Sequence, residues 1–216
     1  MIINLIILAI IIIFSISFHE FSHGYVAHLL GDDTAKNNGR LTLDPTKHIT
    51  LMGLLVMIMT QFRFGWGNPT PINLNNLKNP YRDNLIIAIA GPISNIVLSI
   101  ISILIIQGLP LLHLSSAITL KLGGVFIDAA IINIGLALFN IIPIPPLDGS
   151  HVLKVIFKHH YHIVDTIDKY AIFLLIFCIL PIFPINGNLE SIIQIIILPL
   201  ISTFFTFILS IIYLKY

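Results

Sequence analysis

Residues 2–30, IINLIILAIIIIFSISFHEFSHGYVAHLL, decide the fold class of this protein. A helix needs about 20 mostly apolar residues to cross a bilayer, and this stretch is longer. Its strongly polar side chains concentrate at His19–His23, and it ends at the turn signal Gly31-Asp32-Asp33. No basic residues precede the apolar run and no small-residue cleavage site follows it. We therefore expect an attached transmembrane helix rather than a signal peptide.

The composition of the whole chain agrees with a membrane protein. Hydrophobic residues make up 56% of the 216 positions and charged residues 10%, against roughly 25% charged residues in soluble domains. The net charge of +1 excludes a nucleic-acid binder that depends on basic charge. The length predicts a single domain, 1–216, with a catalytic core over about 1–153 and C-terminal helices over about 164–216.

Five further apolar runs follow the first, at 51–62, 85–106, 125–142, 171–185 and 192–213. The run 51–62 would rise only about 18 Å as a helix, so it is predicted to re-enter the membrane or to lie at its interface. With it left out, five spans place every Lys and Arg except Lys121 on the cytoplasmic side, whereas a sixth span mixes them. We predict an all-α polytopic membrane protein of five to six transmembrane helices, with five preferred.

Two segments between the first and third runs are typical of short extended structure. Gly39–Leu43 and Asn68–Asn73 lie between turn residues, and the prolines of the second restrict it to an edge position. These segments predict a small β-sheet at the membrane edge.

The sequence His19-Glu20-Phe21-Ser22-His23 has the H-E-x-x-H pattern on a helix. Its two histidines share one face and can hold zinc, and Glu20 can act as a general base. Two core histidines beside a capping glutamate are the structural alternative. That alternative leaves ionisable groups about 25 Å along an apolar helix, where each costs about 2.5 to 3.5 kcal/mol unless partnered. A bound cation removes that cost.

A catalytic zinc usually has three protein ligands and one open position. Glu190, the other glutamate, is predicted to lie on the outer side, far from the histidines. Asp148 follows a proline-rich stretch just beyond the run 125–142 and is predicted to lie at the depth of the histidines. On its own, Asp148-Gly149 is typical of a turn at the membrane surface. Because the H-E-x-x-H pattern supplies only two of the three expected ligands, Asp148 is instead predicted to be a metal ligand.

Three motifs in order resemble the site-2 protease family of intramembrane zinc metalloproteases. They are His19–His23, Gly91-Pro-Ile-Ser-Asn95, and the stretch Asn140–Gly149, which reads NIIPIPPLDG. The resemblance covers about residues 18–153. Gly39–Leu43 and Phe64–Pro69 also resemble the smaller bacterial members, which carry no PDZ domain.

The resemblance implies a role for each matching residue. His19, His23 and Asp148 would bind one Zn²⁺ per chain, and Glu20 would activate water. Asn140 would hold the substrate, and Asn95 is a further candidate for substrate binding.

The implied function is cleavage of a transmembrane segment of a membrane-protein substrate near the cytoplasmic face of a bacterial cell membrane. Its partners would be this substrate and the lipid bilayer, with no nucleic acid. A zinc transporter is one alternative, but it needs a second polar cluster toward the outside, where the sequence offers only Asp128 and Asn133. A non-catalytic homologue that binds membrane partners is another, although the base and all three ligands are present. The histidine-rich loop His151–His162 is more typical of solvated side chains than of a metal site.

Overall fold

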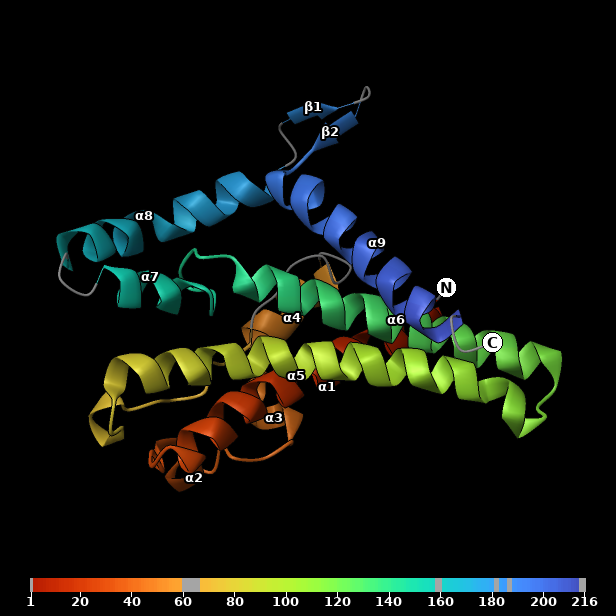
Figure 1. Cartoon of the computed structure of the whole chain (residues 1–216), viewed down its shortest axis with the longest axis horizontal. Helices are drawn as coiled ribbons and strands as arrows, with labels where there is room; N and C mark the ends of the chain where they lie inside the picture. The colour runs from red at the N-terminus through yellow and green to blue at the C-terminus, as the bar shows by residue number, and fades with distance from the viewer. Residues whose placement is uncertain (1, 60–66, 158–160, 181–182, 186–187, 214–216) are drawn as a thin grey trace. The chain divides into compact units, whose positions relative to one another are not determined.

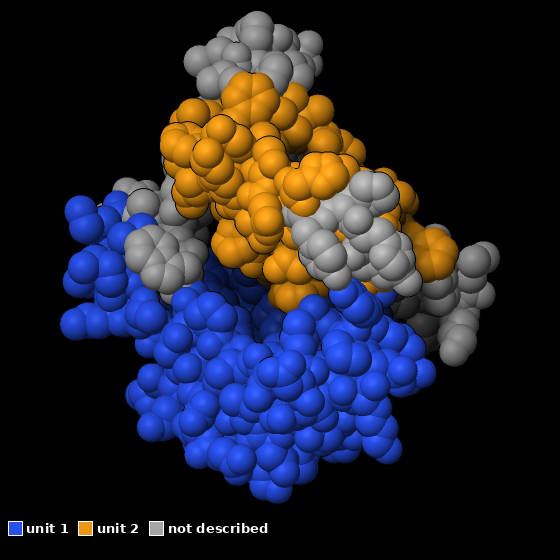
Figure 2. Space-filling model, turned by 90° about the vertical axis from the view of Figure 1, so that its left-hand side faces the viewer, with its two compact units in different colours: residues 1–137 blue, residues 138–216 orange. Residues whose placement is uncertain are grey.

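The computed structural model of the chain describes residues 2–59, 67–157, 161–180, 183–185 and 188–213. Helices dominate these residues, as Figure 1 shows. The chain divides into two compact units, residues 1–137 (unit 1) and 138–216 (unit 2), which Figure 2 colours blue and orange.

Unit 1 holds three long helices and several short ones. Its elements are α1 (Ile2–Leu29), α2 (Thr34–Asn37), α3 (Pro45–His48), α4 (Leu51–Met59), η1 (Leu74–Asn76), α5 (Pro80–Gly108), η2 (Leu109–Leu112) and the larger part of α6 (Ser116–Ile141). Unit 2 begins within α6. It continues with α7 (Ser150–Ile156), α8 (Tyr161–Ile179), β1 (Phe183–Ile185), β2 (Asn188–Glu190) and α9 (Ile192–Tyr213).

Within the described residues, three helices are long and apolar enough to cross a membrane. They are α1, α5 together with η2, and α6, with 28, 33 and 26 residues. Even α6 is about 39 Å long, which exceeds the hydrocarbon thickness of about 30 Å. These helices confirm the prediction of a helical membrane protein. The count of five spans stays a prediction, because α8 carries charged residues in its first half and the apolar part of α9 within the described residues is shorter.

The described part of the run 51–62 forms the nine-residue helix α4. A helix of this length rises about 14 Å, roughly half of the hydrocarbon thickness. Residues 60–62 lie outside the described residues. Residues 51–59 alone are therefore too short to span the bilayer as a helix.

The end of α1 is fixed by a glycine turn. Gly31 adopts a φ of +105°, which L side chains rarely tolerate. Its N–H donates to His28 O at 3.1 Å, and Asp32 N–H donates to Ala27 O at 2.9 Å. This is the Schellman pattern, which satisfies the last carbonyls of a helix. As a result, Asp32 lies immediately beside the end of α1.

Small side chains let the long helices approach closely. α1 packs along α5, and the buried residues of α1 include Ser15, Ser17 and Gly24. Between α5 and α6, the buried Ser99 hydroxyl donates to Ala130 O at 2.9 Å. Small residues at such interfaces are typical of helix packing in membranes, where close van der Waals contact replaces the hydrophobic effect.

The small sheet predicted at the membrane edge is not confirmed. Residues 39–43 form turns and bends, and residues 68–73 have no regular secondary structure. A single isolated antiparallel bridge joins Ile49 to Gly67. Pro69 and Pro71 supply no N–H groups, which limits the ladder that this segment can form. Part of the predicted segment Phe64–Pro69 lies outside the described residues.

The sheet within the described residues lies elsewhere in the chain. β1 and β2 form an antiparallel pair in unit 2, with Phe183 opposite Glu190. The sequence predicts residues 183–185 as part of the apolar run 171–185 and does not predict this hairpin.

Candidate metal centre

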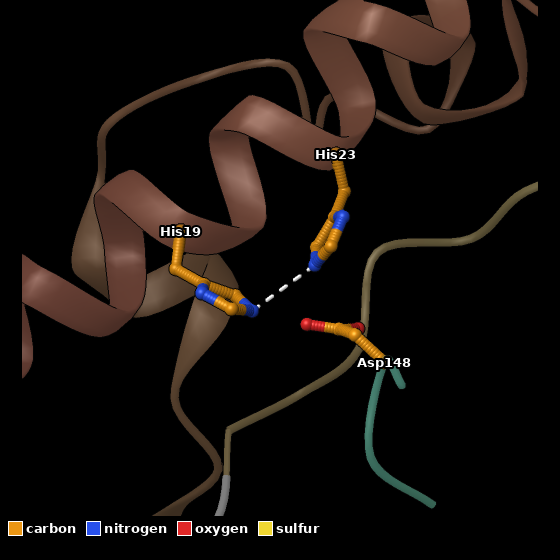
Figure 3. Close-up of side chains that lie close together, drawn as sticks. All are labelled: His19, His23 and Asp148. Atoms are coloured by element: carbon orange, nitrogen blue, oxygen red, sulfur yellow. Dashed lines mark hydrogen bonds between the residues drawn. The ribbon is translucent and has the colours of Figure 1, made fainter. Parts of the chain in front are cut away.

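His19 and His23 lie one helical turn apart on the same face of α1, and both are buried. Their Nε2 atoms are 3.0 Å apart, the contact drawn as a dashed line in Figure 3. Two nitrogens bound to one tetrahedral zinc ion at about 2.0 to 2.1 Å would lie about 3.3 Å apart. The pair is therefore close to the spacing that a shared zinc ion requires.

The Nδ1 atoms of both rings contact oxygen acceptors on α5. His19 Nδ1 donates to the Asn95 side-chain oxygen at 2.6 Å, and His23 Nδ1 donates to Ile87 O at 2.7 Å. A carbonyl oxygen only accepts, so each neutral ring carries its proton on Nδ1 and a lone pair on Nε2. The two Nε2 atoms lie 3.0 Å apart, so both lone pairs can bind one cation. Since neutral imidazole is a common zinc ligand, this pair fits the metal that the sequence predicts.

Gly91 provides the space in which the two rings meet. A Cβ atom at this position would lie 2.4 Å from His23 Nε2 and 2.5 Å from His19 Nε2. The next residue, Pro92, lies inside α5 and has no N–H to offer the carbonyl of Ala88. Gly91 therefore lets α5 approach the two histidines. Pro92 interrupts the backbone hydrogen-bond ladder of α5 close to Ile87, whose carbonyl oxygen accepts the bond from His23.

Glu20, between the two histidines in sequence, contacts a different part of unit 1. Its carboxylate oxygen Oε2 accepts a hydrogen bond from Thr70 N–H at 2.7 Å. The Thr70 hydroxyl also donates to the backbone carbonyl of Glu20 at 2.9 Å. Two bonds thus fasten Thr70 to the same helical residue, one to its side chain and one to its main chain.

The segment that carries Thr70 is anchored before that residue by polar contacts. Arg40 Nη2 donates to Asn68 O at 2.6 Å and to Pro69 O at 3.2 Å. Asn68 N–H in turn donates to His48 O at 2.7 Å. These bonds hold the extended chain in place without a β-ladder.

Asp32 anchors the same segment after Thr70. This fully buried carboxylate accepts bonds from Asn73 N–H and Asn76 Nδ2, each at 2.7 Å, and from Thr34. Burial raises the pKa of the Asp32 carboxyl, but the bonds from Thr34, Asn73 and Asn76 outweigh it and hold that pKa below the ordinary value of 3.8. The ionised form of Asp32 is therefore part of the native structure.

Asn140 and Asp148 belong to unit 2, where a tight turn follows α6. Gly149 N–H donates to Asn140 O at 2.7 Å, which fixes the chain reversal that carries Asp148. A Cβ on Gly149 would lie 2.0 Å from Ile141 O and 2.6 Å from Ile142 O. Glycine is therefore required after Asp148 for lack of space, although its φ of −57° is open to any residue.

The predicted site residues fall into three groups in the structure. His19 contacts both His23 and Asn95 in unit 1, and the carboxylate of Glu20 contacts Thr70 in the same unit. Asn140 and Asp148 form the third group, in unit 2. The substrate-binding role of Asn95 stays a prediction, and the contact that the structure gives it is with His19. Of the histidine-rich loop, His159 and His160 lie outside the described residues.

The partners of these side chains could not be predicted from the sequence. Thr70 lies in a segment that was assigned only to a sheet, and the bond to Glu20 uses its backbone N–H, which no residue type reveals. Ile87 likewise acts through its carbonyl. The one signal in the sequence was the Gly-Pro-x-x-Asn motif, which marks the part of α5 that contacts the histidines.

Comparison with known proteins finds a peptidase family model and relatives that are named as zinc metalloproteases. The family model described as "Peptidase family M50" matches residues 111–183, which include Asn140 and Asp148. The Bacillus subtilis protein named "Putative zinc metalloprotease YwhC" is 38% identical over 149 residues, which are 68% of this chain and 67% of that protein. No solved structure matches the chain significantly.

Two further relatives carry similar names. The Mycolicibacterium smegmatis protein "Putative zinc metalloprotease Rip2" is 29% identical over 147 residues, covering 65% of this chain and 53% of its own length. "Zinc metalloprotease MJ0392" of Methanocaldococcus jannaschii is 26% identical over 162 residues, covering 72% of this chain and 35% of its own length. The chain therefore matches only part of these longer proteins.

Proposed function

The chain belongs to peptidase family M50, the site-2 protease family, and on that premise we propose that it is an intramembrane endopeptidase. It is a zinc metallopeptidase in a membrane, and its proposed substrates are membrane-spanning segments cut near the cytoplasmic face. The observation that carries the proposal is the buried histidine pair on α1, whose facing Nε2 atoms lie 3.0 Å apart beside Glu20. Such a pair inside an apolar helix is costly without a metal ion.

We propose that His19, His23 and Asp148 hold one zinc ion per chain. Each offers one ligand atom, a ring nitrogen or a carboxylate oxygen, and Figure 3 draws the three side chains. Two nitrogens and one carboxylate oxygen leave the fourth position of a tetrahedral zinc for the reaction, as in other catalytic zinc sites.

When bound, zinc supplies Lewis-acid activation of the scissile carbonyl and of water. Glu20 takes the proton from the attacking water and passes it to the leaving amine. The Thr70 N–H holds Oε2 of Glu20 at 2.7 Å, so the proton is handled by the other oxygen, Oε1. Asn140 contacts the backbone of the unwound substrate.

The orientation of the site is proposed from charge placement. Ten of the eleven Lys and Arg residues lie on the side of the histidines when five spans are counted, and such residues concentrate in the cytoplasm. A bacterial cell membrane is proposed because YwhC and Rip2 come from bacteria.

The test compares Glu20→Gln with the parent chain in cells. We expect Glu20→Gln to keep its zinc and to lose turnover by about 10²- to 10⁴-fold, since it removes the base and keeps the ligands. N-terminal proteomics of membranes from the two strains would identify membrane proteins that only the parent cleaves. Glu190→Gln, a change at the other glutamate, is the matched control and should cleave like the parent.

Two outcomes would contradict the proposal. If the purified parent protein contained no bound zinc, the proposed metal centre would be wrong. Equal cleavage by the parent and by Glu20→Gln would remove Glu20 as the base.

A further inference from the structure

A chain of side-chain amides leads from the middle of α6 to His19. Asn95 Nδ2 donates to the side-chain oxygen of Asn133 at 2.9 Å, and Asn133 Nδ2 donates to Ala129 O at 2.9 Å. Both asparagines are buried, with 0% and 3% of their surface exposed. This series of hydrogen bonds therefore connects three helices, from α6 through α5 to α1.

The backbone carbonyl at the far end of this chain fixes the direction of every bond in it. A carbonyl can only accept, so Asn133 must turn its amide nitrogen to Ala129 and its oxygen to Asn95. Asn95 must then turn its nitrogen to Asn133 and its oxygen to His19. His19 in turn must hold its proton on Nδ1, which leaves the lone pair on Nε2, the atom that faces His23.

We propose that Asn133 is a positioning residue that sets the tautomer of His19 through Asn95. The inference deepens the proposed function and rests on the zinc site described there. Without the oxygen of Asn133, the Nδ2 of Asn95 keeps only its long bond to Ser15 O at 3.4 Å, so the amide of Asn95 can turn and present its nitrogen to His19. His19 would then accept at Nδ1 and carry its proton on Nε2, and a protonated nitrogen cannot bind a metal ion.

His23 depends on no such chain. Its Nδ1 donates directly to Ile87 O, which has only one possible role. The two ligands of α1 therefore reach the same tautomer by different routes. Loss of Asn133 should disturb His19 and leave His23 unchanged.

Asn133 could instead act only as an interhelical hydrogen bond. Ser99 offers the matched control, because its hydroxyl bonds Ala130 O across the same α5 and α6 interface at 2.9 Å and is equally buried. The Ser99 hydroxyl bonds Ala130 O and takes no part in the hydrogen bonds that Asn95 makes to Asn133 and His19. A purely structural role predicts similar effects of Asn133→Leu and Ser99→Ala on zinc binding.

The first experiment measures zinc affinity of the full chain in detergent by competition with a chelator at fixed pH. We expect Asn133→Leu to weaken zinc binding by about 10- to 100-fold, the usual loss when a partner behind a ligating histidine is removed. Ser99→Ala should remain within about twofold of the parent. In the metal-free protein, ¹⁵N NMR of labelled histidine should show the His19 proton on Nδ1 in the parent and partly on Nε2 in Asn133→Leu. The His19 signals are identified by their loss in His19→Gln.

A second variant separates orientation from packing. Asn95→Asp places a carboxylate beside His19, and a carboxylate offers only acceptors whichever way it turns. In this background, Asn133→Leu should no longer weaken zinc binding, so the double-mutant cycle should be strongly non-additive.

Three results would overturn the inference. Parental zinc affinity in Asn133→Leu would show that the tautomer does not depend on Asn133. An equal loss in the Asn95→Asp background would assign the effect to helix packing. Absence of zinc binding by the parent itself would overturn the proposed metal site together with this inference.

Discussion

His19 and Glu20 are neighbours in α1, yet the structure holds them by different kinds of partner. His19 contacts a side-chain amide, Asn95, inside the packed spanning helices, whereas Glu20 contacts a backbone N–H, that of Thr70, in an extended segment. A side-chain partner must be a particular residue type, so it leaves a trace in the sequence. A backbone donor can come from any residue except proline, so it leaves none.

The surroundings of the two partners differ in the same way. The histidine region is built from helices whose backbone N–H groups are mostly used within the helix, so its polar side chains bond one another or a backbone carbonyl, as His23 bonds Ile87 O. The segment that holds Glu20 is fastened by Arg40, His48 and Asp32, which bond its main-chain groups. Substitutions of side chains should therefore affect the histidine region most, and the loss of a backbone donor should affect Glu20 most.

The largest effect is expected for Gly91→Ala. The new methyl group would lie 2.4 Å from His23 Nε2, and the rings cannot move without losing their bonds to Asn95 and Ile87. We expect zinc affinity to fall by about 100-fold or more, measured by chelator competition. Hydrogen exchange of Thr70 N–H should not change, which would sharpen the contrast between the two regions.

Gly108→Ala is the matched control, since a Cβ there meets nothing within 4 Å at the end of the same helix. If Gly91→Ala bound zinc as tightly as the parent protein, the close approach of α5 to the histidines would not be needed for zinc binding.

A smaller effect is expected for Thr70→Pro, which removes the N–H that Glu20 accepts. Thr70 precedes Pro71, and a residue before a proline favours an extended conformation that proline itself can adopt. The new proline should therefore keep the direction of the chain at this position. Loss of a hydrogen bond to a charged group costs about 1.5 to 3 kcal/mol, so we expect kcat to fall about 10- to 100-fold at unchanged KM and zinc content. Turnover of a substrate identified by the Glu20→Gln comparison is the measurement.

Thr70→Val is the control, because it keeps the N–H and removes only the hydroxyl that bonds Glu20 O. If Thr70→Val lowered kcat as much as Thr70→Pro, the backbone donor would not be the important partner and the comparison would fail.

The smallest effect is expected for Asp32→Asn, which weakens the far anchor of the same segment. The pKa of Asp32 is lowered in the folded protein, so its ionised form contributes stability above its ordinary pKa of 3.8, and this contribution is lost as the pH falls through the lower folded value. We expect Asp32→Asn to lower stability by about 1 to 3 kcal/mol at pH 7. Thermal unfolding of both proteins should show this difference shrinking below pH 3.8.

Asp44→Asn is the control for Asp32→Asn, because Asp44 caps α3 and asparagine caps a helix equally well. A stability difference between the parent and Asp32→Asn that stays constant down to low pH would contradict the role of the charge.

The sequence predicted the helices well where apolar residues continue to the helix end. The prediction 2–30 matches α1, and 192–213 matches α9. For α6, the run 125–142 misses the first nine residues, which contain Lys121 and Gly123-Gly124 and lower the hydropathy without ending the helix. α8 begins ten residues before the predicted run because its first turns are polar.

The candidate site was predictable as a set of chemical groups but not as a set of contacts. Spacing alone placed His19 and His23 on one face, since i and i+4 are neighbours in any α-helix. Asn133 stands alone in an apolar run with no motif around it, so nothing in the sequence connected it to His19. The contact between Thr70 and Glu20 left no trace in the sequence because it uses a backbone N–H.

The turn after α6 has a practical consequence for mutational scanning. Gly149 has no chemistry to offer, yet any side chain on it would collide with the end of the preceding helix. A screen that scores only lost activity will therefore rank this glycine with the metal ligands. Metal content and folding have to be scored in parallel before such a screen can separate residues that react from residues that merely leave room.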